Sequence, residues 1–283
     1  MANSVLTNSS ALIALQNLNR TNERLSDAQS RVNTGLKVQG AKDNAAIWAV
    51  AQNQRADKGS LESVTTSLNR ATSLADVSLA AGESIADLLL ELQTKAVAAA
   101  DPSATTATRK AYDDEVQALL KSIASFADNA VFDGANILDG SLATPMNFLA
   151  SADGAETIAL NRQDMSLLGL GLAADAGPPV VAAPNLLTEA GATDALARIK
   201  AAIGTASSRL AELGAQAKQI ENHTTFVSKL SDALETGIGN LVDADMAKES
   251  ARLQALQVQQ QLGVQALSIA NQSPQIILSL FQN

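Results

Sequence analysis

Residues 12–35 read LIALQNLNRTNERLSDAQSRVNTG and carry the strongest structural signal in the chain. The larger side chains recur at alternating spacings of three and four, which is the heptad pattern of helices that pack along a shared line of contact. Gly35 follows the last periodic residue and is typical of a helix C-terminus. We therefore predict one long helix over about residues 4–34. Its predicted contact line consists of Leu15, Leu18, Asn22, Leu25, Gln29 and Val32.

The opposite end of the chain has a matching pattern. No side chain is charged in residues 1–19 or in residues 253–283, and both ends are rich in Leu, Ile, Val and Ala. Asn, Gln and Ser interrupt these apolar runs well before the roughly 18 residues that a membrane span needs. We expect the two ends to bury against each other and against copies of the chain, with no membrane partner. The predicted C-terminal contact line is Leu253, Leu256, Gln260, Val264 and Leu267.

Composition narrows the class of protein further. Of the 283 residues 46% are hydrophobic but only 2% are aromatic, so Ala and Leu supply most of the apolar content, as in packed helices. The net charge of -9 and the absence of a basic stripe argue against a nucleic-acid partner. The chain has no Cys, which excludes disulfides and thiolate metal sites.

These patterns predict a mainly α fold: a long antiparallel coiled-coil bundle built from both chain ends, with a small β-hairpin region in the middle. An isolated helix is marginal in water, so we expect both ends to be largely disordered in the monomer and to fold on association. The expected helices span about residues 4–34, 43–100, 106–127, 193–241 and 243–281, and the expected strands are 147–149 and 157–160, joined by a turn at 151–154. We expect Leu88 on the second helix and Phe126 on the third helix to face the core.

No combination of residues predicts catalysis. His223 is the single His of the chain and has neither a second His nor a Cys with which to form a zinc or catalytic site. Asp243, Asp245 and Glu249 lack the further oxygen ligands and the Gly of a calcium loop. We expect Asp243 to cap the last helix and Asp245 to favour its positive end. The sequence predicts no enzyme and no catalytic, cofactor-binding or metal site.

The sequence allows three alternative roles for the amide side chains on the predicted contact lines. Asn22, Gln29 and Gln260 would fix the register of the helices if they are buried, because a buried amide tolerates only alignments that satisfy it. Alternatively these side chains face water. A third alternative is an uncharged, wet channel wall, to which Gln257, Gln259, Gln260 and Gln261 would contribute.

Short motifs follow one another in a fixed order along the two ends of the chain. They cover about the first 140 and the last 90 residues, and the set is far more specific than any single member. The motifs are RVNTGLKV at residues 31–38, AKDNAA at 41–46, FDG at 132–134, ILDG at 137–140, LGAQ at 213–216, DADMAKE at 243–249 and ANQSPQ at 270–275.

This set resembles the signature motifs of bacterial flagellin. Ile47 and Trp48 stand where many members have a small Gly, as in short flagellins of alphaproteobacterial type. The resemblance implies an inner filament-core domain from residues 1–42 and 245–283. It also implies an outer helical domain over residues 43–244, with the β-hairpin region at about 141–185. No room remains for separate variable outer domains.

The resemblance also implies a function. The chain would be a structural subunit that polymerises head to tail into the flagellar filament for motility, outside the cell. It would be exported through the flagellar type III apparatus without a cleaved signal peptide. The implied partners are an export chaperone and the hook-associated and cap proteins. The alternatives are a hook–filament junction protein and, further away, a secreted coiled-coil adhesin or effector.

Burial of the terminal apolar stripes would then drive assembly. The residues that we expect at the assembly interface are Leu12, Leu15, Leu18, Leu25, Leu253, Leu256, Leu267, Ile277, Leu280 and Phe281.

Overall fold

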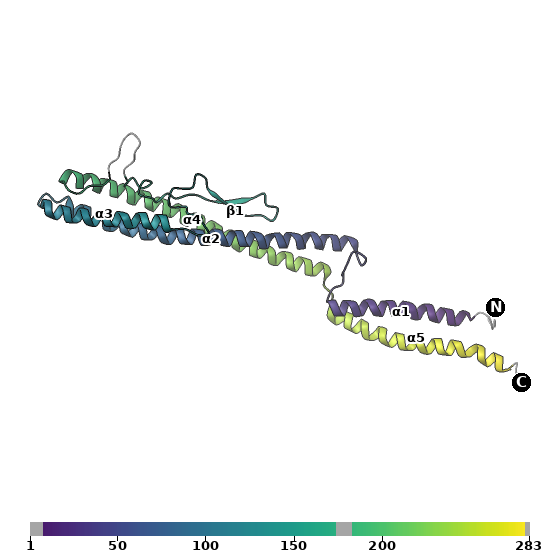
Figure 1. Ribbon diagram of the computed structural model, residues 1–283. Helices are drawn as coiled ribbons and strands as arrows, with labels where there is room; N and C mark the ends of the chain where they lie inside the picture. The colour runs from purple at the N-terminus through teal and green to yellow at the C-terminus, as the bar shows by residue number, and fades with distance from the viewer. Residues whose placement is uncertain (1–7, 174–182, 281–283) are drawn as a thin grey trace. The chain divides into compact units, whose positions relative to one another are not determined.

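The computed structural model describes residues 8–173 and 183–280, with the backbone alone for residues 273–280. The described chain is mainly helical with one small antiparallel sheet, and the predicted fold class is confirmed (Figure 1). Its contacts divide it into a central unit, residues 57–232, and a terminal unit, residues 1–56 and 233–283. The elements are α1 (Ser9–Thr34), α2 (Ala45–Ala99), α3 (Thr106–Asn129), β1 (Met146–Leu149), β2 (Thr157–Leu160), α4 (Glu189–Val242) and α5 (Met246–Leu280).

The central unit is a helical bundle to which α2, α3 and α4 contribute. Lys95 on α2 forms an ion pair with Glu115 on α3, with 2.6 Å between Nζ and Oε2. Helices α2 and α4 approach closely at Gly82, where an added Cβ would lie 2.6 Å from Leu210 Cδ2. The buried residues of α2 keep the heptad spacing from Leu61 to Ala99. This continuous row of small and large apolar side chains is the core of the bundle.

At two positions the bundle core buries a residue next to the one that the sequence predicted. Leu89 is buried in α2, where the prediction placed Leu88. In α3 the buried side chain is Ala127, whereas the predicted Phe126 is exposed. Alanine allows the helices to approach closely, and the bulky neighbour one position away is then turned out of the contact.

The β-hairpin packs on the bundle through side chains that satisfy its backbone. Strands β1 and β2 pair antiparallel with Met146 opposite Leu160, and the turn contains Gly154 at a φ of 73°. The Leu149 N–H donates to Ser67 Oγ on α2 over 3.0 Å. His223 on α4 donates from Nε2 to the Ala150 carbonyl over 2.7 Å. The two predicted strands and their turn are confirmed.

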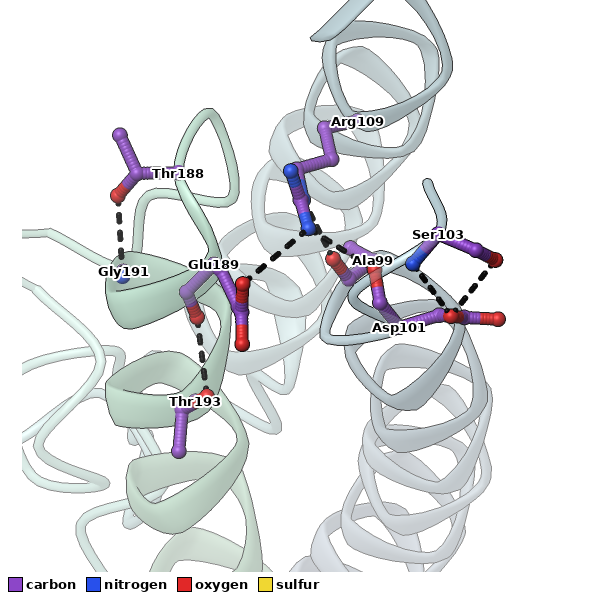
Figure 2. A network of polar contacts seen from close by, with 8 residues as sticks. All are labelled: Ala99, Asp101, Ser103, Arg109, Thr188, Glu189, Gly191 and Thr193. Carbon is purple, nitrogen blue, oxygen red and sulfur yellow. Dashed lines mark hydrogen bonds and ion pairs between the residues drawn. The ribbon is translucent and has the colours of Figure 1, made fainter. Parts of the chain in front are cut away.

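One end of the bundle is closed by Arg109, which lies in the first turn of α3 (Figure 2). Its Nε donates to the Ala99 carbonyl and its Nη2 to the Asp101 carbonyl, each over 2.9 Å. The same guanidinium lies 4.0 Å from the Glu189 carboxylate in the first turn of α4. A single partly buried cation therefore satisfies carbonyls at and just after the C-terminal end of α2 and also contacts α4.

The terminal unit has a small core of its own. Val38, Ala51, Ile238 and Val242 are buried together, and the single Trp of the chain, Trp48, packs against them. This cluster joins the segment after α1 to the end of α4. The proposed division at residues 42 and 245 lies inside this unit and stays a prediction.

Candidate self-assembly surface

Helices α1 and α5 form an antiparallel pair, the terminal helix pair (Figure 1). Helix α1 begins at the cap Asn8, whose side chain accepts from the Ala11 N–H, and ends at Gly35 with a φ of 72°, as predicted. Leu25, Ala28 and Leu256 are buried between the helices, and Leu253 packs against them. This small apolar cluster holds the two chain ends together.

The contact line between the two helices keeps the predicted heptad spacing but is shifted by one residue at alternate positions. Ala28 is buried on α1, and the predicted neighbour Gln29 is exposed. On α5 the contact runs through Gly263, where an added Cβ would lie 3.2 Å from Leu18 Cδ1, and Val264 is exposed. Small residues at these positions let the backbones come close together. The larger predicted residues are therefore turned outward.

Polar contacts join the helices at both ends and in the middle. Gln260 Nε2 donates to Asn22 Oδ1 over 2.9 Å, at an edge of the pair that faces solvent. Asn8 Nδ2 donates to the Ala270 carbonyl over 2.7 Å. At the opposite end Arg31 Nη1 lies 3.4 Å from Glu249 Oε1. The Asn22–Gln260 contact thus links the helices at a solvent-exposed position, so the alternative of a buried amide does not hold for this pair.

The cap of α5 corrects one prediction. Asp245 Oδ1 accepts from the backbone N–H groups of Ala247 and Lys248, each over 3.1 Å, so Asp245 caps the helix. Asp243, the predicted cap, instead forms a backbone bridge with Leu36. Helix α5 therefore begins at Met246, after this bridge and later than expected.

The residues predicted for the assembly interface fall into groups with different surroundings. Leu25 and Leu256 are buried within the chain, and Leu18, Leu253 and Leu267 are partly buried. Leu12 and Leu15 are 54% and 42% exposed, so this chain leaves them uncovered. The side chains of Ile277 and Leu280, and the whole of Phe281, lie outside the described residues.

Further exposed apolar side chains were missed by the sequence analysis. Most of them lie on α5, where Val258, Leu262 and Ile269 follow a second heptad row because the helix is apolar on more than one face. Each of them is more than half exposed: Ile13 on α1, and Val258, Leu262 and Ile269 on α5. Val264, which the sequence placed on the contact line, is also more than half exposed. Together with Leu12 and Leu15 all these side chains form what we call the outward stripe.

A shallow groove lies between α1 and α5, and two residues of the outward stripe line it. It has a volume of about 540 Å³ and no charged residue lines it. Ile13 and Leu262 are its large apolar side chains, and the other lining residues are small or carry an amide. The lining residues are Ser10, Ile13, Ala14, Asn17, Leu262, Gly263, Ala266 and Ala270. An apolar side chain from another helix would fit such a groove.

Two titratable side chains near the β-hairpin have structural partners. His223 bonds the β-hairpin, and its ring lies 5.8 Å from that of Phe226. The Asn161 Nδ2 hydrogen bond lowers the pKa of the Glu212 carboxyl. Among the described residues no group of three His, Cys, Asp or Glu side chains gathers that could hold a metal ion. None of the described helices is long and apolar enough to cross a membrane.

Comparison with known proteins agrees with these features along the whole chain. Residues 5–143 match the bacterial flagellin N-terminal helical region and residues 196–281 the C-terminal helical region. Flagellin FljM of Caulobacter vibrioides is 49% identical over 280 residues, 99% of each chain. The chain belongs to the bacterial flagellin family. Flagellin FljK of the same organism is also 49% identical, and a flagellin of Brucella melitensis is 39% identical over 287 residues, each with 99% of both chains covered.

This flagellin is therefore a structural subunit of the bacterial flagellar filament, and it is not an enzyme. The relatives belong to alphaproteobacteria, as the residues around Trp48 predicted. The comparisons favour neither a junction protein nor a secreted adhesin or effector.

Proposed function

We propose that this flagellin polymerises through the outward stripe of its terminal helix pair. The observation that carries the proposal is the exposure of large apolar side chains on a part of the chain where the neighbouring side chains carry no charge. Patches of this kind on a soluble protein mark surfaces that another molecule covers. The partner that best fits an uncharged helical surface is the same surface on another copy.

The driving force would be apolar burial. Each side chain of the outward stripe is already partly covered, so complete burial would contribute on the order of 1 kcal/mol per residue. Leu12 and Leu15 on α1 would act together with Val258, Leu262 and Ile269 on α5. Leu25 and Leu256 would contribute indirectly, because they hold the two helices in one unit. Ile277, Leu280 and Phe281 would extend the interface towards the C-terminus.

The same surface suggests what must happen before assembly. An apolar α5 would self-associate too early in the cytoplasm unless a chaperone covered it. We infer export through the flagellar type III apparatus without a cleaved signal peptide, followed by contact with hook-associated and cap proteins. The inner filament core would contain residues 1–42 and 245–283, and residues 43–244 would form the outer part.

Electron microscopy of purified monomer, after seeding or addition of a precipitating salt, tests the proposal. Circular dichroism before and after would report helix formation at the ends. We expect long filaments together with a rise in helix content, because the terminal helices fold as they are covered. Monomers or short aggregates with unchanged helicity would contradict it.

A further inference from the structure

The start of α5 lies beside the end of α1. The Ala244 N–H donates to the Gly35 carbonyl over 2.8 Å, and the Lys37 N–H donates to the Val242 carbonyl over 2.7 Å. The connection after α1 and the connection before α5 are therefore bonded to each other. This arrangement brings the two helices together at one end and restricts how far one can shift along the other, and the contacts further along the pair add to that restriction.

Apolar contacts alone leave the alignment of the two helices weakly determined. The contact line between the helices is composed mainly of Leu, Ala and Gly, which accept several alignments of similar packing quality. A shift by one heptad moves a helix by about 10 Å along its partner. Such a shift would separate the residues that line the groove from α1, such as Ile13, from those that line it from α5, such as Leu262.

Arg31 and Glu249 form the charged contact nearest the bonded end of the pair. Glu249 is 8% exposed, and its Oε1 lies 3.4 Å from Arg31 Nη1 and 3.8 Å from Arg252 Nη1. Its Oε2 is buried and has no hydrogen-bond partner among the described residues. A buried carboxylate is costly when its cation is removed. An alignment that moves Arg31 away from Glu249 is therefore strongly disfavoured.

We propose that the Arg31–Glu249 ion pair sets the register of α1 against α5 within each chain and so positions the outward stripe for assembly. Neither residue belongs to the outward stripe or lines the groove, so both are positioning residues. The amide contacts of Asn22 with Gln260 and of Asn8 with the Ala270 carbonyl agree with the same alignment. The role in assembly rests on the proposed function, whereas the role in register does not.

Charge exchange on the full chain tests the role in assembly. Arg31→Glu alone and Glu249→Arg alone place like charges together and should raise the critical concentration for polymerisation at least roughly tenfold. The double variant Arg31→Glu/Glu249→Arg restores an opposite pair and should polymerise nearly as the natural chain does. The control is Lys218→Glu/Glu221→Lys, an exchange of an exposed pair on α4, which should change nothing. Normal filaments from either single variant, or a folded double variant that fails to assemble, would overturn the assembly role.

Mixing the two single variants tests whether the contact forms within one chain. Pairing between neighbouring chains would restore opposite charges in the mixture, whereas pairing within each chain would not. We expect the mixture to assemble as poorly as its components. Recovery in the mixture would overturn the intrachain assignment.

Register can be read separately by cross-linking, because the chain contains no Cys. Asn22→Cys/Gln260→Cys should form a disulfide in the observed alignment, and Asn22→Cys/Leu267→Cys should form one only after a shift of one heptad. Arg31→Glu should weaken the first cross-link and strengthen the second, and an unchanged ratio would overturn the role in register. If the filaments form through a surface other than the outward stripe, the proposed function fails, and the cross-links still decide whether the ion pair sets the register.

Discussion

The central bundle and the terminal helix pair share the same heptad spacing but cover very different parts of their apolar surface. In the bundle α2 is contacted by α3 and α4, and core side chains such as Leu68 and Leu92 are fully buried. In the terminal pair each helix has one partner, and on α1 only Leu25 and Ala28 are buried among its described residues. The bundle can complete its core within one chain. The terminal pair leaves apolar surface that other copies can cover.

The largest effect is expected from a substitution that should abolish assembly but leave the bundle folded. Leu256→Asp should abolish filament formation, because a carboxylate would enter the small buried cluster with Leu25 and Ala28. The bundle should keep its thermal transition, since position 256 belongs to the terminal unit. Sedimentation and calorimetry on the same sample measure both outcomes. Leu256→Met is the control and should still assemble, because it conserves volume.

A companion variant would show whether the outward stripe itself is needed. Leu262 is 58% exposed, so Leu262→Asp should leave the monomer unchanged by circular dichroism and still prevent assembly. Filaments of normal length from Leu262→Asp would place the assembly contacts elsewhere.

A truncation in the bundle core should instead lower the stability of the monomer. Leu92→Ala removes a fully buried side chain and should lower the stability of the monomer by about 2–5 kcal/mol. Leu90, on the same helix, is 50% exposed, and Leu90→Ala should change stability by less than about 0.5 kcal/mol. Chemical denaturation measures the difference. Equal effects of the two variants would contradict the assigned core.

The end of the bundle should show a smaller effect. Arg109→Ala removes two hydrogen bonds to backbone carbonyls and should cost about 1–3 kcal/mol of monomer stability. Its exposed neighbour Lys110 provides the control, Lys110→Ala. Thermal melts of the two variants should differ clearly, and matching melts would show that Arg109 does not close the bundle.

The smallest effect concerns pH. The pKa of Glu212 is lowered in the folded chain, chiefly by the hydrogen bond from Asn161, so its contribution is present above the ordinary carboxyl pKa. That contribution is lost as the pH falls through the lowered pKa. Because the group is exposed, we expect only about 0.3 kcal/mol. Glu212→Gln should make the β-hairpin region less sensitive to acid by hydrogen exchange, and an unaltered pH dependence would contradict this role.

The helices, their approximate ends and the β-hairpin followed from local features of the sequence. Periodicity identified α1 and α5, Gly35 marked a helix end, and the turn at residues 151–154 joined the two strands. The family motifs are local as well. Each of these signals acts over a few residues, which is why one sequence was sufficient to find them.

The contacts between distant segments could not be predicted in the same way. Asp245 caps α5 in place of Asp243 because residue 243 bridges to Leu36, far away in the sequence. The ion pair between Arg31 and Glu249 joins residues 218 positions apart, and no local pattern indicates it.

The sequence by itself determined that both chain ends are helical, apolar and uncharged, because periodicity and composition are properties of one segment. Only the tertiary structure decided which of two adjacent residues on a helix faces its partner. Ala28 is buried where Gln29 was expected, and Ala127 where Phe126 was expected. Neighbouring positions on a helix differ by about 100° in direction, so a heptad pattern of large residues cannot resolve them when small residues stand alongside. How closely the two backbones approach decides which of the adjacent residues is buried. That distance depends on the side chains of both helices.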